Sequence, residues 1–206
     1  MRIISGEFGG RRLKSPKGEA TRPMLDRVRE AMFSSLGALV DGAHVLDLFA
    51  GTGSLGLEAL SRGAASVRFV ESDKRARRVL LANVAMLEVE DRAEVTAGDA
   101  LSASLWAGPD GASEWARIIF ADPPYPLVHE REGRRKMFAA VAELAADVLA
   151  PGGALILHTH PRDAEAKDFP EGFELERREY GRTALWYLLK PLSEVDAPPV
   201  GEAGTA

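Results

Sequence analysis

Hydrophobic and polar positions follow two alternating periods along most of this chain. Short apolar runs with the length and composition of strands lie at 44–49, 67–71, 93–97, 117–121 and 153–159. Patterns of helical period lie between them, at 54–62, 73–88, 99–106 and 132–149. Alternation of strands and helices predicts an α/β fold, with an open and mainly parallel sheet covered by helices on both faces.

The C-terminal part does not continue this alternation of strands and helices. Two apolar runs, 173–180 and 183–189, are separated only by Gly181-Arg182, and a parallel crossover would need about a dozen residues. These runs therefore predict an antiparallel hairpin that closes the sheet. Pro151-Gly152-Gly153 predicts a sharp turn into the fifth strand, and the composition of 191–206 predicts a disordered acidic tail.

The N-terminal part has its own pattern. Residues 2–13 predict a short hairpin around Gly9-Gly10, followed by a loop to Pro23. Apolar residues then recur at helical spacing over 25–36, and Gly37 is a natural stop. We therefore expect three parts, namely an N-terminal extension (1–37), a main domain (38–190) and the tail.

Composition narrows the possible functions. The chain has 206 residues and no cysteine, which excludes disulfides, thiolate metal sites and cysteine nucleophiles. The four histidines lack metal-ligand spacing, although His158 and His160 share one face of a strand, and we expect no metal. No apolar run reaches the length of a membrane span and no signal peptide is evident, so we expect a cytoplasmic protein that does not enter a membrane.

The net charge of −5 is unevenly distributed. Residues 1–30 contain eight basic and four acidic side chains, although the chain as a whole is acidic. Binding to phosphate requires a locally positive face rather than a basic average, so this extension is a candidate RNA-facing surface. The alternative is a solvated charge run at a mobile terminus.

A glycine-rich loop follows the first strand of the main domain. The segment Asp47-Leu48-Phe49-Ala50-Gly51-Thr52-Gly53 ends an apolar strand and precedes a helix, with Ser54 as its expected N-cap. Glycines allow a ligand to approach the backbone closely. Gly51, Gly53 and Gly56 also satisfy the dinucleotide pattern G-x-G-x-x-G, so a nicotinamide (NAD) enzyme is an alternative.

Asp47 favours S-adenosylmethionine (SAM) over NAD, whereas Glu71 would serve the ribose that both ligands share. Asp47, at the lip of the loop, suits a ligand with an ammonium and a sulfonium and would repel a pyrophosphate. Glu71 ends the second strand, where it can accept both ribose hydroxyls. Asp99 follows the third strand, where it can accept from the adenine amine, although Asp47 and Asp99 could instead be helix caps. The expected cofactor-binding residues are Asp47, Phe49, Ala50, Gly51, Thr52, Gly53, Glu71, Ser72, Asp99 and Ala100.

Asp122-Pro123-Pro124-Tyr125 begins where a buried strand ends, which is where open α/β sheets bind ligands. An exocyclic amine on a base is planar and poorly nucleophilic, because its lone pair is delocalised into the ring. The Asp122 carboxylate and the Pro123 carbonyl can accept its two N–H groups and favour the pyramidal form, while the two prolines fix the backbone. Tyr125 offers a face for stacking of an extruded base, worth about 1–3 kcal/mol. The alternative is a Pro-Pro turn with an ordinary surface tyrosine.

Several segments together resemble one family. Arg22 to Phe33 (RPMLDRVREAMF) is similar to the R-P-T-x-D-R-V-R-E-A-L-F signature of the RsmD-like 16S ribosomal RNA guanine-N2 methyltransferases. The resemblance extends to Arg2 to Gly6, Gly10 to Leu13, Asp47 to Arg62, Glu71 to Asp73 and Tyr180 to Thr183, and covers nearly the whole chain up to about residue 190. Met24-Leu25 replaces a threonine-containing pair, so no role is carried over to position 24, and Asp26 is the expected helix cap.

This resemblance implies a class I SAM-dependent methyltransferase that modifies the N2 amine of a guanine in 16S rRNA within an assembling small ribosomal subunit. The small single-domain organisation predicts a monomer. It implies catalytic roles for Asp122 to Tyr125. The candidate contacts to RNA or to an active-site lid are Arg11, Arg12, Arg22, Arg27 and Arg29. Arg27 and Arg29 could instead be solvated groups near Glu30.

Two other functions remain open at this point. An adenine-N6 methyltransferase acting on RNA or DNA would use the same Asp122 motif, although the chain shows no separate target-recognition domain. A non-catalytic SAM- or RNA-binding module for ribosome assembly is the other, and the intact Asp122, Gly51 and Gly53 argue against it.

Overall fold

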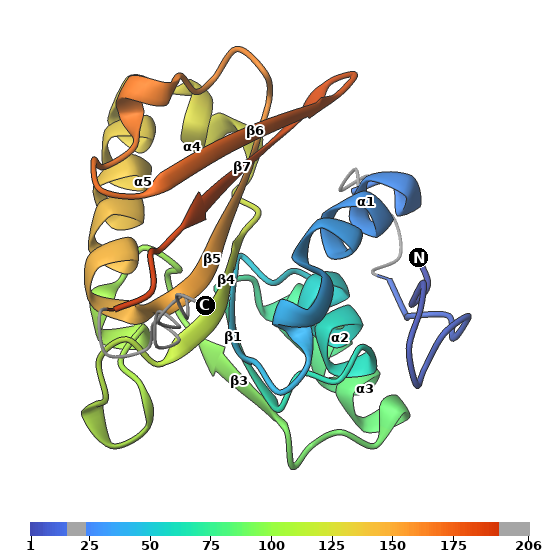
Figure 1. Ribbon diagram of the computed structural model, residues 1–206. Coiled ribbons are helices and arrows are strands. Elements are labelled where there is room, and N and C mark those ends of the chain that lie inside the picture. Colours follow the sequence, from blue (N-terminus) through green and yellow to red (C-terminus); the bar gives the residue numbers. More distant parts are fainter. Residues whose placement is uncertain (16–23, 194–206) are drawn as a thin grey trace, which may run out of the picture.

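The computed structural model describes residues 1–15 and 24–193, and its seven strands form one sheet in the order β3-β2-β1-β4-β5-β7-β6 (Figure 1). The strands are β1 (His44–Leu48), β2 (Ser66–Glu71), β3 (Ala93–Ala97), β4 (Ala116–Ala121), β5 (Leu149–Thr159), β6 (Glu174–Tyr180) and β7 (Thr183–Leu189). The first five are parallel, and β7 runs antiparallel to both β5 and β6. The predicted α/β fold with a C-terminal antiparallel hairpin is thus confirmed.

Helices cover both faces of the sheet (Figure 1). On one face lie α1 (Asp26–Leu36), α2 (Ser54–Ser61) and α3 (Lys74–Leu87), and on the other lie α4 (Tyr125–His129) and α5 (Arg131–Glu143). Short helical turns complete the secondary structure, at Gly37–Val40, Ala103–Leu105, Pro109–Gly111, Leu144–Val148 and Ala166–Asp168.

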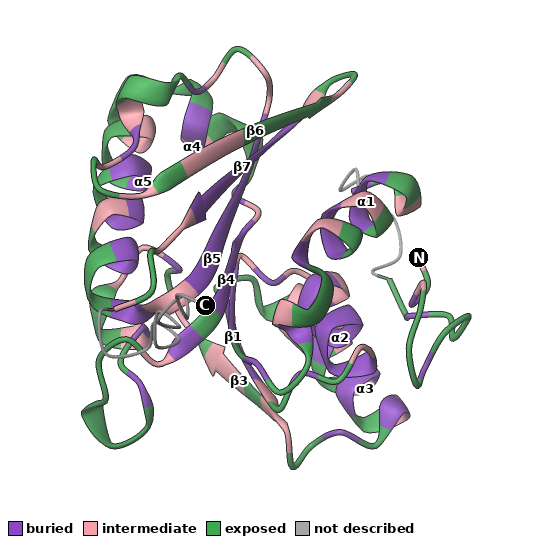
Figure 2. Ribbon diagram, in the orientation of Figure 1, coloured by how far each residue is buried: buried purple, intermediate pink, exposed green. Residues whose placement is uncertain are grey.

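The period of two along each strand separates two cores, one on each side of the sheet. On β4, Ile118 and Phe120 pack toward α1 to α3, while Ile119 and Ala121 pack toward α5. The Phe120 ring meets Phe33 of α1 at 5.6 Å between centroids. The strands are accordingly buried in the centre of Figure 2, whereas the outer side of α5 is exposed.

The N-terminal segment packs on the first of these cores. Ile3, Phe8 and Leu13 are buried in the same cluster as the apolar residues of α1, α2 and α3. The expected hairpin is present as an isolated antiparallel bridge between Arg2 and Arg12 rather than as two strands. Residues 1–15 therefore share their core with the main domain.

A buried carboxylate fixes this segment to α2. Glu58 is fully buried, and its oxygens accept hydrogen bonds from the backbone amides of Ile4 (2.7 Å) and Ser5 (3.1 Å). The Nε atoms of Arg62 and Arg29 lie 2.7 and 3.9 Å from the same carboxylate. The anion is thus compensated on several sides, as a buried charge requires.

The structure corrects the expectation for Arg29. Its side chain is fully buried, so it neither contacts RNA nor lies as a solvated group near Glu30. Besides Glu58, it contacts Asp26 (3.2 Å) and the carbonyl oxygen of Arg2. Burial lowers the pKa of Arg29, and the charges of Glu58 and Asp26 oppose this effect.

Several local expectations were wrong. The helix expected at 99–106 is a single 3-10 turn at Ala103–Leu105, because Ser102 is extended and Asp99 accepts from the Leu101 and Ser102 amides in a local turn instead. By contrast, the helix expected at 132–149 is confirmed as α5, which continues into the π turn at Leu144–Val148.

The expected turn at 151–153 belongs to β5, beside an irregularity in the β4–β5 register. Ser54 and Asp26 are first residues of their helices rather than caps. The expected tail falls on 194–206, outside the described residues, while 191–193 have no regular structure.

Candidate functional site

The carboxyl ends of the parallel strands meet at one edge of the sheet, and backbone hydrogen bonds join the segments that follow them. The Ala50 amide donates to the Val70 carbonyl (3.1 Å), and the Gly98 amide donates to the Glu71 carbonyl (3.3 Å). The Asp122 amide reaches the Leu48 carbonyl at 3.5 Å. The glycine loop, Glu71, the Asp99 segment and Asp122 are therefore neighbours, as the sequence predicted.

The glycine loop has an unusual backbone. Phe49, Gly51 and Gly53 have φ angles of +58°, +56° and +84°, and such a value is uncommon for phenylalanine. A Cβ added at Gly51 would meet nothing closer than the Phe49 carbonyl oxygen at 4.0 Å, so the backbone is bare there. At Gly56 a Cβ would lie 2.2 Å from the Phe69 ring. Gly51 is thus open to a ligand, whereas Gly56 permits close packing of α2 on β2.

Glu71 supports this loop from the end of β2. Its carboxylate accepts hydrogen bonds from the amides of Gly51 and Asp73, both at 2.7 Å. Asp73 in turn caps α3 by accepting from the amides of Arg75 and Ala76. Each Glu71 oxygen keeps further lone-pair capacity, so the residue can hold the loop and still accept from a ribose hydroxyl.

Asp47 does not lie at the lip of the loop, and this expectation was wrong. Its side chain is on the face of β1 that packs against α2, and it is only 1% exposed. One oxygen accepts from the Gly56 amide at 2.9 Å. This amide is in the first turn of α2 and has no acceptor within the helix, so the carboxyl provides one. Burial raises the pKa of Asp47 to about 8, with smaller contributions from the charges of Asp122 and Glu71, while the Gly56 bond opposes the shift.

The remaining expected cofactor residues surround the same edge of the sheet. Asp99 is exposed and accepts from the Leu101 amide at 3.0 Å, Ser72 is exposed, and Ala100 is buried. The Thr52 carbonyl accepts from the side chain of Asn83 (3.0 Å), which fixes the loop to α3. A bare backbone at Gly51 flanked by the carboxylates of Glu71 and Asp99 fits a ligand rich in hydroxyl and amine donors, such as SAM.

Asp122 to Tyr125 leave the sheet at the end of β4. The Asp122 side chain is 33% exposed, Pro123 is buried, and Pro124 has φ −60°. Tyr125 begins α4 and is 43% exposed. One exposed carboxylate, a fixed backbone and an exposed ring therefore lie beside the glycine loop.

His158 is a site residue that the sequence did not reveal as such. Its Nδ1 lies 2.6 Å from the Asp122 Oδ1, and its ring meets Tyr125 edge-on at 5.9 Å. The side chain is 10% exposed, and Nε2 has no hydrogen-bond partner among the described residues. The parallel pairing of Ala121 with Leu157 places the next residues, Asp122 and His158, side by side. That register could have indicated the contact.

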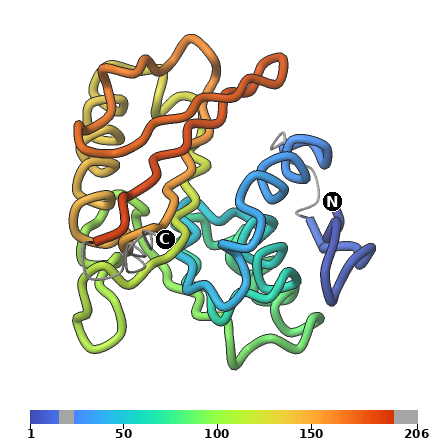
Figure 3. The backbone as a smooth tube through the Cα atoms, in the orientation of Figure 1, coloured from blue at the N-terminus to red at the C-terminus, as the bar shows by residue number. Residues whose placement is uncertain are grey.

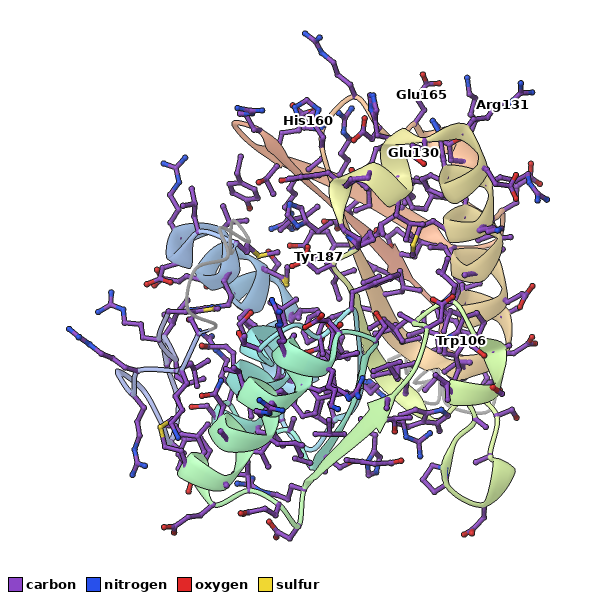
Figure 4. All side chains as sticks on the ribbon, turned by 180° about the vertical axis from the view of Figure 1, so that it is seen from behind. Trp106, Glu130, Arg131, His160, Glu165 and Tyr187 are labelled. Atoms are coloured by element: carbon purple, nitrogen blue, oxygen red, sulfur yellow. The ribbon has the colours of Figure 1, made fainter. Side chains whose placement is uncertain are left out.

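A cleft of about 810 Å³ opens beside Asp122, between α1 and the turn of the β6–β7 hairpin. Tyr125 and His158 line its inner end, and Arg27 lines the α1 side. Figure 4 shows two more lining residues, His160 and Glu130, at the end of the molecule from which the hairpin extends. Met24, where the threonine is missing, is buried in the core and also borders this cleft.

The basic residues expected to contact RNA are dispersed. Arg27 lines the cleft, whereas Arg11 and Arg12 are exposed on the N-terminal segment, with Arg11 donating to the Met86 carbonyl of α3 (3.3 Å). Figure 3 shows this segment on the far side of α1 from the β6–β7 hairpin. Arg22 lies outside the described residues.

Within residues 1–15 and 24–193, no helix has the length and apolarity of a membrane span. Histidine and carboxylate side chains form no group of three or more suited to a metal ion in the same part of the chain.

The strand order, the glycine loop after β1 and the Asp-Pro-Pro-Tyr segment after β4 define a methyltransferase of the Rossmann-like class. The family model described as "Conserved hypothetical protein 95" matches residues 1–189. The chain belongs to this family.

Three relatives illustrate the similarity. The candidate rRNA methyltransferase YlbH of Bacillus subtilis is 36% identical over 186 residues, which are 90% of this chain and 96% of YlbH. Ribosomal RNA small subunit methyltransferase D of Escherichia coli strain K12 is 40% identical over 125 residues, 61% of this chain and 60% of that protein. The structure of the candidate methyltransferase yhhF from Escherichia coli superposes with a TM-score of 0.75 at 30% identity, covering 94% of this chain and 99% of its own.

Proposed function

We propose that this protein transfers a methyl group from SAM to the exocyclic N2 amine of a guanine in 16S rRNA. The observation that carries the proposal is the placement of the Asp122 carboxylate, which is partly exposed beside the glycine loop and opens onto the cleft through Tyr125 and His158. SAM, when bound, supplies an electrophilic methyl carbon on a sulfonium that is already a good leaving group.

Asp122 and Pro123 act on the amine. The Asp122 carboxylate and the Pro123 carbonyl each accept one N–H, which directs the nitrogen lone pair toward the methyl carbon. Asp122, or water beside it, would accept the proton that the amine loses on methylation. Pro124 holds the backbone and Tyr125 stacks on the base, so that little reorganisation is needed.

His158 positions Asp122. With its ring proton on Nδ1, His158 donates to Oδ1 and stops the carboxylate from rotating, so that Oδ2 remains free for the substrate amine. A buried Nε2 without a partner costs about 1–3 kcal/mol. Such a cost is typical of groups retained for function rather than stability.

The cofactor residues divide the remaining tasks. Gly51 allows the close approach of the ligand, Glu71 accepts from the ribose hydroxyls, and Asp99 accepts from the adenine amine. Asp47 lies beneath the loop. Binding of a cationic ligand nearby favours the ionised form of its buried carboxyl. Phe49, Ala50, Thr52, Gly53, Ser72 and Ala100 complete the expected cofactor contacts.

The substrate assignment rests on the similarity to relatives named for ribosomal RNA methylation and on the basic extension. Residues 1–37 form the RNA-facing extension and 38–190 the catalytic domain, with Arg11, Arg12 and Arg27 as RNA contacts. The enzyme acts as a cytoplasmic monomer on the assembling small subunit.

The test is transfer of labelled methyl from SAM to small-subunit particles from cells that lack this protein, followed by nucleoside analysis of the digested rRNA. We expect N2-methylguanosine. N6-methyladenosine would refute the choice of base while preserving the site. Tight SAM binding without transfer to particles, naked rRNA or DNA would point instead to a non-catalytic assembly module.

A further inference from the structure

We propose that the cleft beside Asp122 holds the phosphates of the RNA nucleotides that flank the target base, through Arg27, Arg162 and Arg182. This inference rests on the proposed function, because it concerns how the same substrate reaches the same site. It also shifts the main RNA contact from the N-terminal arginines to the β6–β7 hairpin and the loop after β5.

The first observation is the state of these three arginines. All are exposed and line the cleft, and their guanidinium groups have no hydrogen bond or ion pair to another part of the described chain. On the same hairpin, Arg177 and Arg178 are instead paired with Glu179 and Glu176. Uncompensated guanidinium groups that converge on one cleft favour an anionic ligand, and their planar fork matches phosphate.

The acidic residues of the cleft do not cancel this charge. Glu130 and Asp163 are the carboxylates among the lining residues, and Asp163 already lies 3.3 Å from the His129 Nδ1. With the three arginines, the lining is therefore positive, although the chain carries −5 overall.

The second observation is apolar surface beside these charges. Among the large apolar side chains that are exposed in the described chain, Leu25 (59%) and Tyr125 (43%) both line this cleft. Alternating cationic groups and exposed flat or apolar faces suit single-stranded nucleic acid, whose backbone is anionic and whose bases stack. A free inorganic anion would use only the charges.

The third observation is continuity with the reacting group. His158 lines the inner end of the cleft and contacts Asp122 at 2.6 Å, so a base held at Asp122 has its own backbone in the cleft. The hairpin is joined to α1 outside the cleft, because the Arg178 guanidinium of β6 donates to the Ser35 hydroxyl of α1. Gly181, next to Arg182 at the hairpin turn, has φ +66° and no atom within 4 Å of an added Cβ, so the turn is open there.

The test compares an R162A/R182A double variant with the wild type and with R78A. Arg78 is an exposed arginine of α3 that does not line the cleft and makes no hydrogen bond or ion pair within the described chain, so R78A is a matched loss of charge. Binding of a short single-stranded RNA and of 16S rRNA is measured over a range of salt concentrations, together with SAM affinity and kcat at saturating RNA.

We expect the double variant to reduce the slope of log affinity against log salt by about 1.4, from about 0.7 for each lost phosphate contact to a single strand. SAM affinity should not change, the loss of rate should fall mainly on KM for the RNA, and R78A should behave as wild type. An R162K/R182K variant should recover most of the slope, because it keeps the charge.

An unchanged salt slope in R162A/R182A would overturn the proposal, even if the wild type methylates guanine. Conversely, a slope that falls as expected in a protein that transfers no methyl group would support the cleft and refute the proposed reaction. The two proposals therefore fail separately.

Discussion

Asp47 gives the sharpest quantitative prediction, because its buried carboxyl should make the stability of the protein depend on pH in an unusual direction. Its pKa is raised from 3.8 to about 8 in the native protein, chiefly by burial. Between these values the unfolded chain has lost the proton while the native protein keeps it. The native state therefore binds more protons, and the free energy of unfolding falls as pH rises.

The expected magnitude follows from the size of the shift. Each pH unit between about 5 and 8 should remove about 1.4 kcal/mol, or about 4 kcal/mol across that range. This is a large part of the total stability of a typical domain. D47N removes the titration and keeps an oxygen that can accept from the Gly56 amide, so its free energy of unfolding should fall more gently with pH.

The assay is urea unfolding of wild type and D47N at pH 5, 6, 7 and 8. The difference between the two curves isolates Asp47, because all other titrating groups are common to both. Parallel curves would refute the assignment of a proton to Asp47 in the native state. Adding SAM should flatten the wild-type dependence, since a nearby cation favours the ionised carboxylate.

Three further predictions concern the carboxylates and their partners. D122A should abolish methyl transfer while SAM affinity, measured by calorimetry, stays within a few-fold; full activity would refute the mechanism. H158L should lower kcat by about 10- to 100-fold, from the loss of a charge-assisted hydrogen bond of about 1.5–3 kcal/mol, without altering SAM affinity. H158N, whose amide can donate to the same Asp122 oxygen, should recover much of this loss, and equal defects in both variants would contradict the positioning role. E58A should lower the free energy of unfolding by about 3–5 kcal/mol in urea titrations, because it removes the acceptor of the Ile4 and Ser5 amides and leaves the buried Arg29 with Asp26 alone, and a loss below about 1 kcal/mol would show that Glu58 does not stabilise the N-terminal segment.

The fold was predictable because its signals are local. Apolar runs of strand length, separated by helical periods, fixed five parallel strands, and the two residues at Gly181-Arg182 required an antiparallel hairpin. The errors arose where tertiary contacts or chain breakers override the local pattern. A local turn at Asp99 replaced the helix expected there, and Pro151-Gly152-Gly153 lies within β5 rather than before it.

The candidate site was predictable only in part, for a related reason. Motifs identified Gly51, Glu71 and Asp122, because each follows a strand whose end is visible in the sequence. Burial of Asp47 and Arg29 was not visible, since polar side chains enter a core only when partners from distant segments meet them there. His158 and Arg182 belong to the site through strand order, which places β5 beside β4 and the hairpin turn across from α1.

The glycine-loop side and the cleft side of the site therefore differ in charge. On the glycine-loop side, the carboxyls of Asp47, Glu71 and Asp122 are close enough for their charges to interact, and the pKa of Asp47 is raised chiefly by burial and further by the other two charges. On the cleft side, arginines without partners face solvent. A cationic donor attracted to the first and an anionic strand attracted to the second would meet at Asp122, which contacts both regions. Under the proposed function, this separation of charge would let an acidic chain bring together a sulfonium and a polyanion at a single carboxylate.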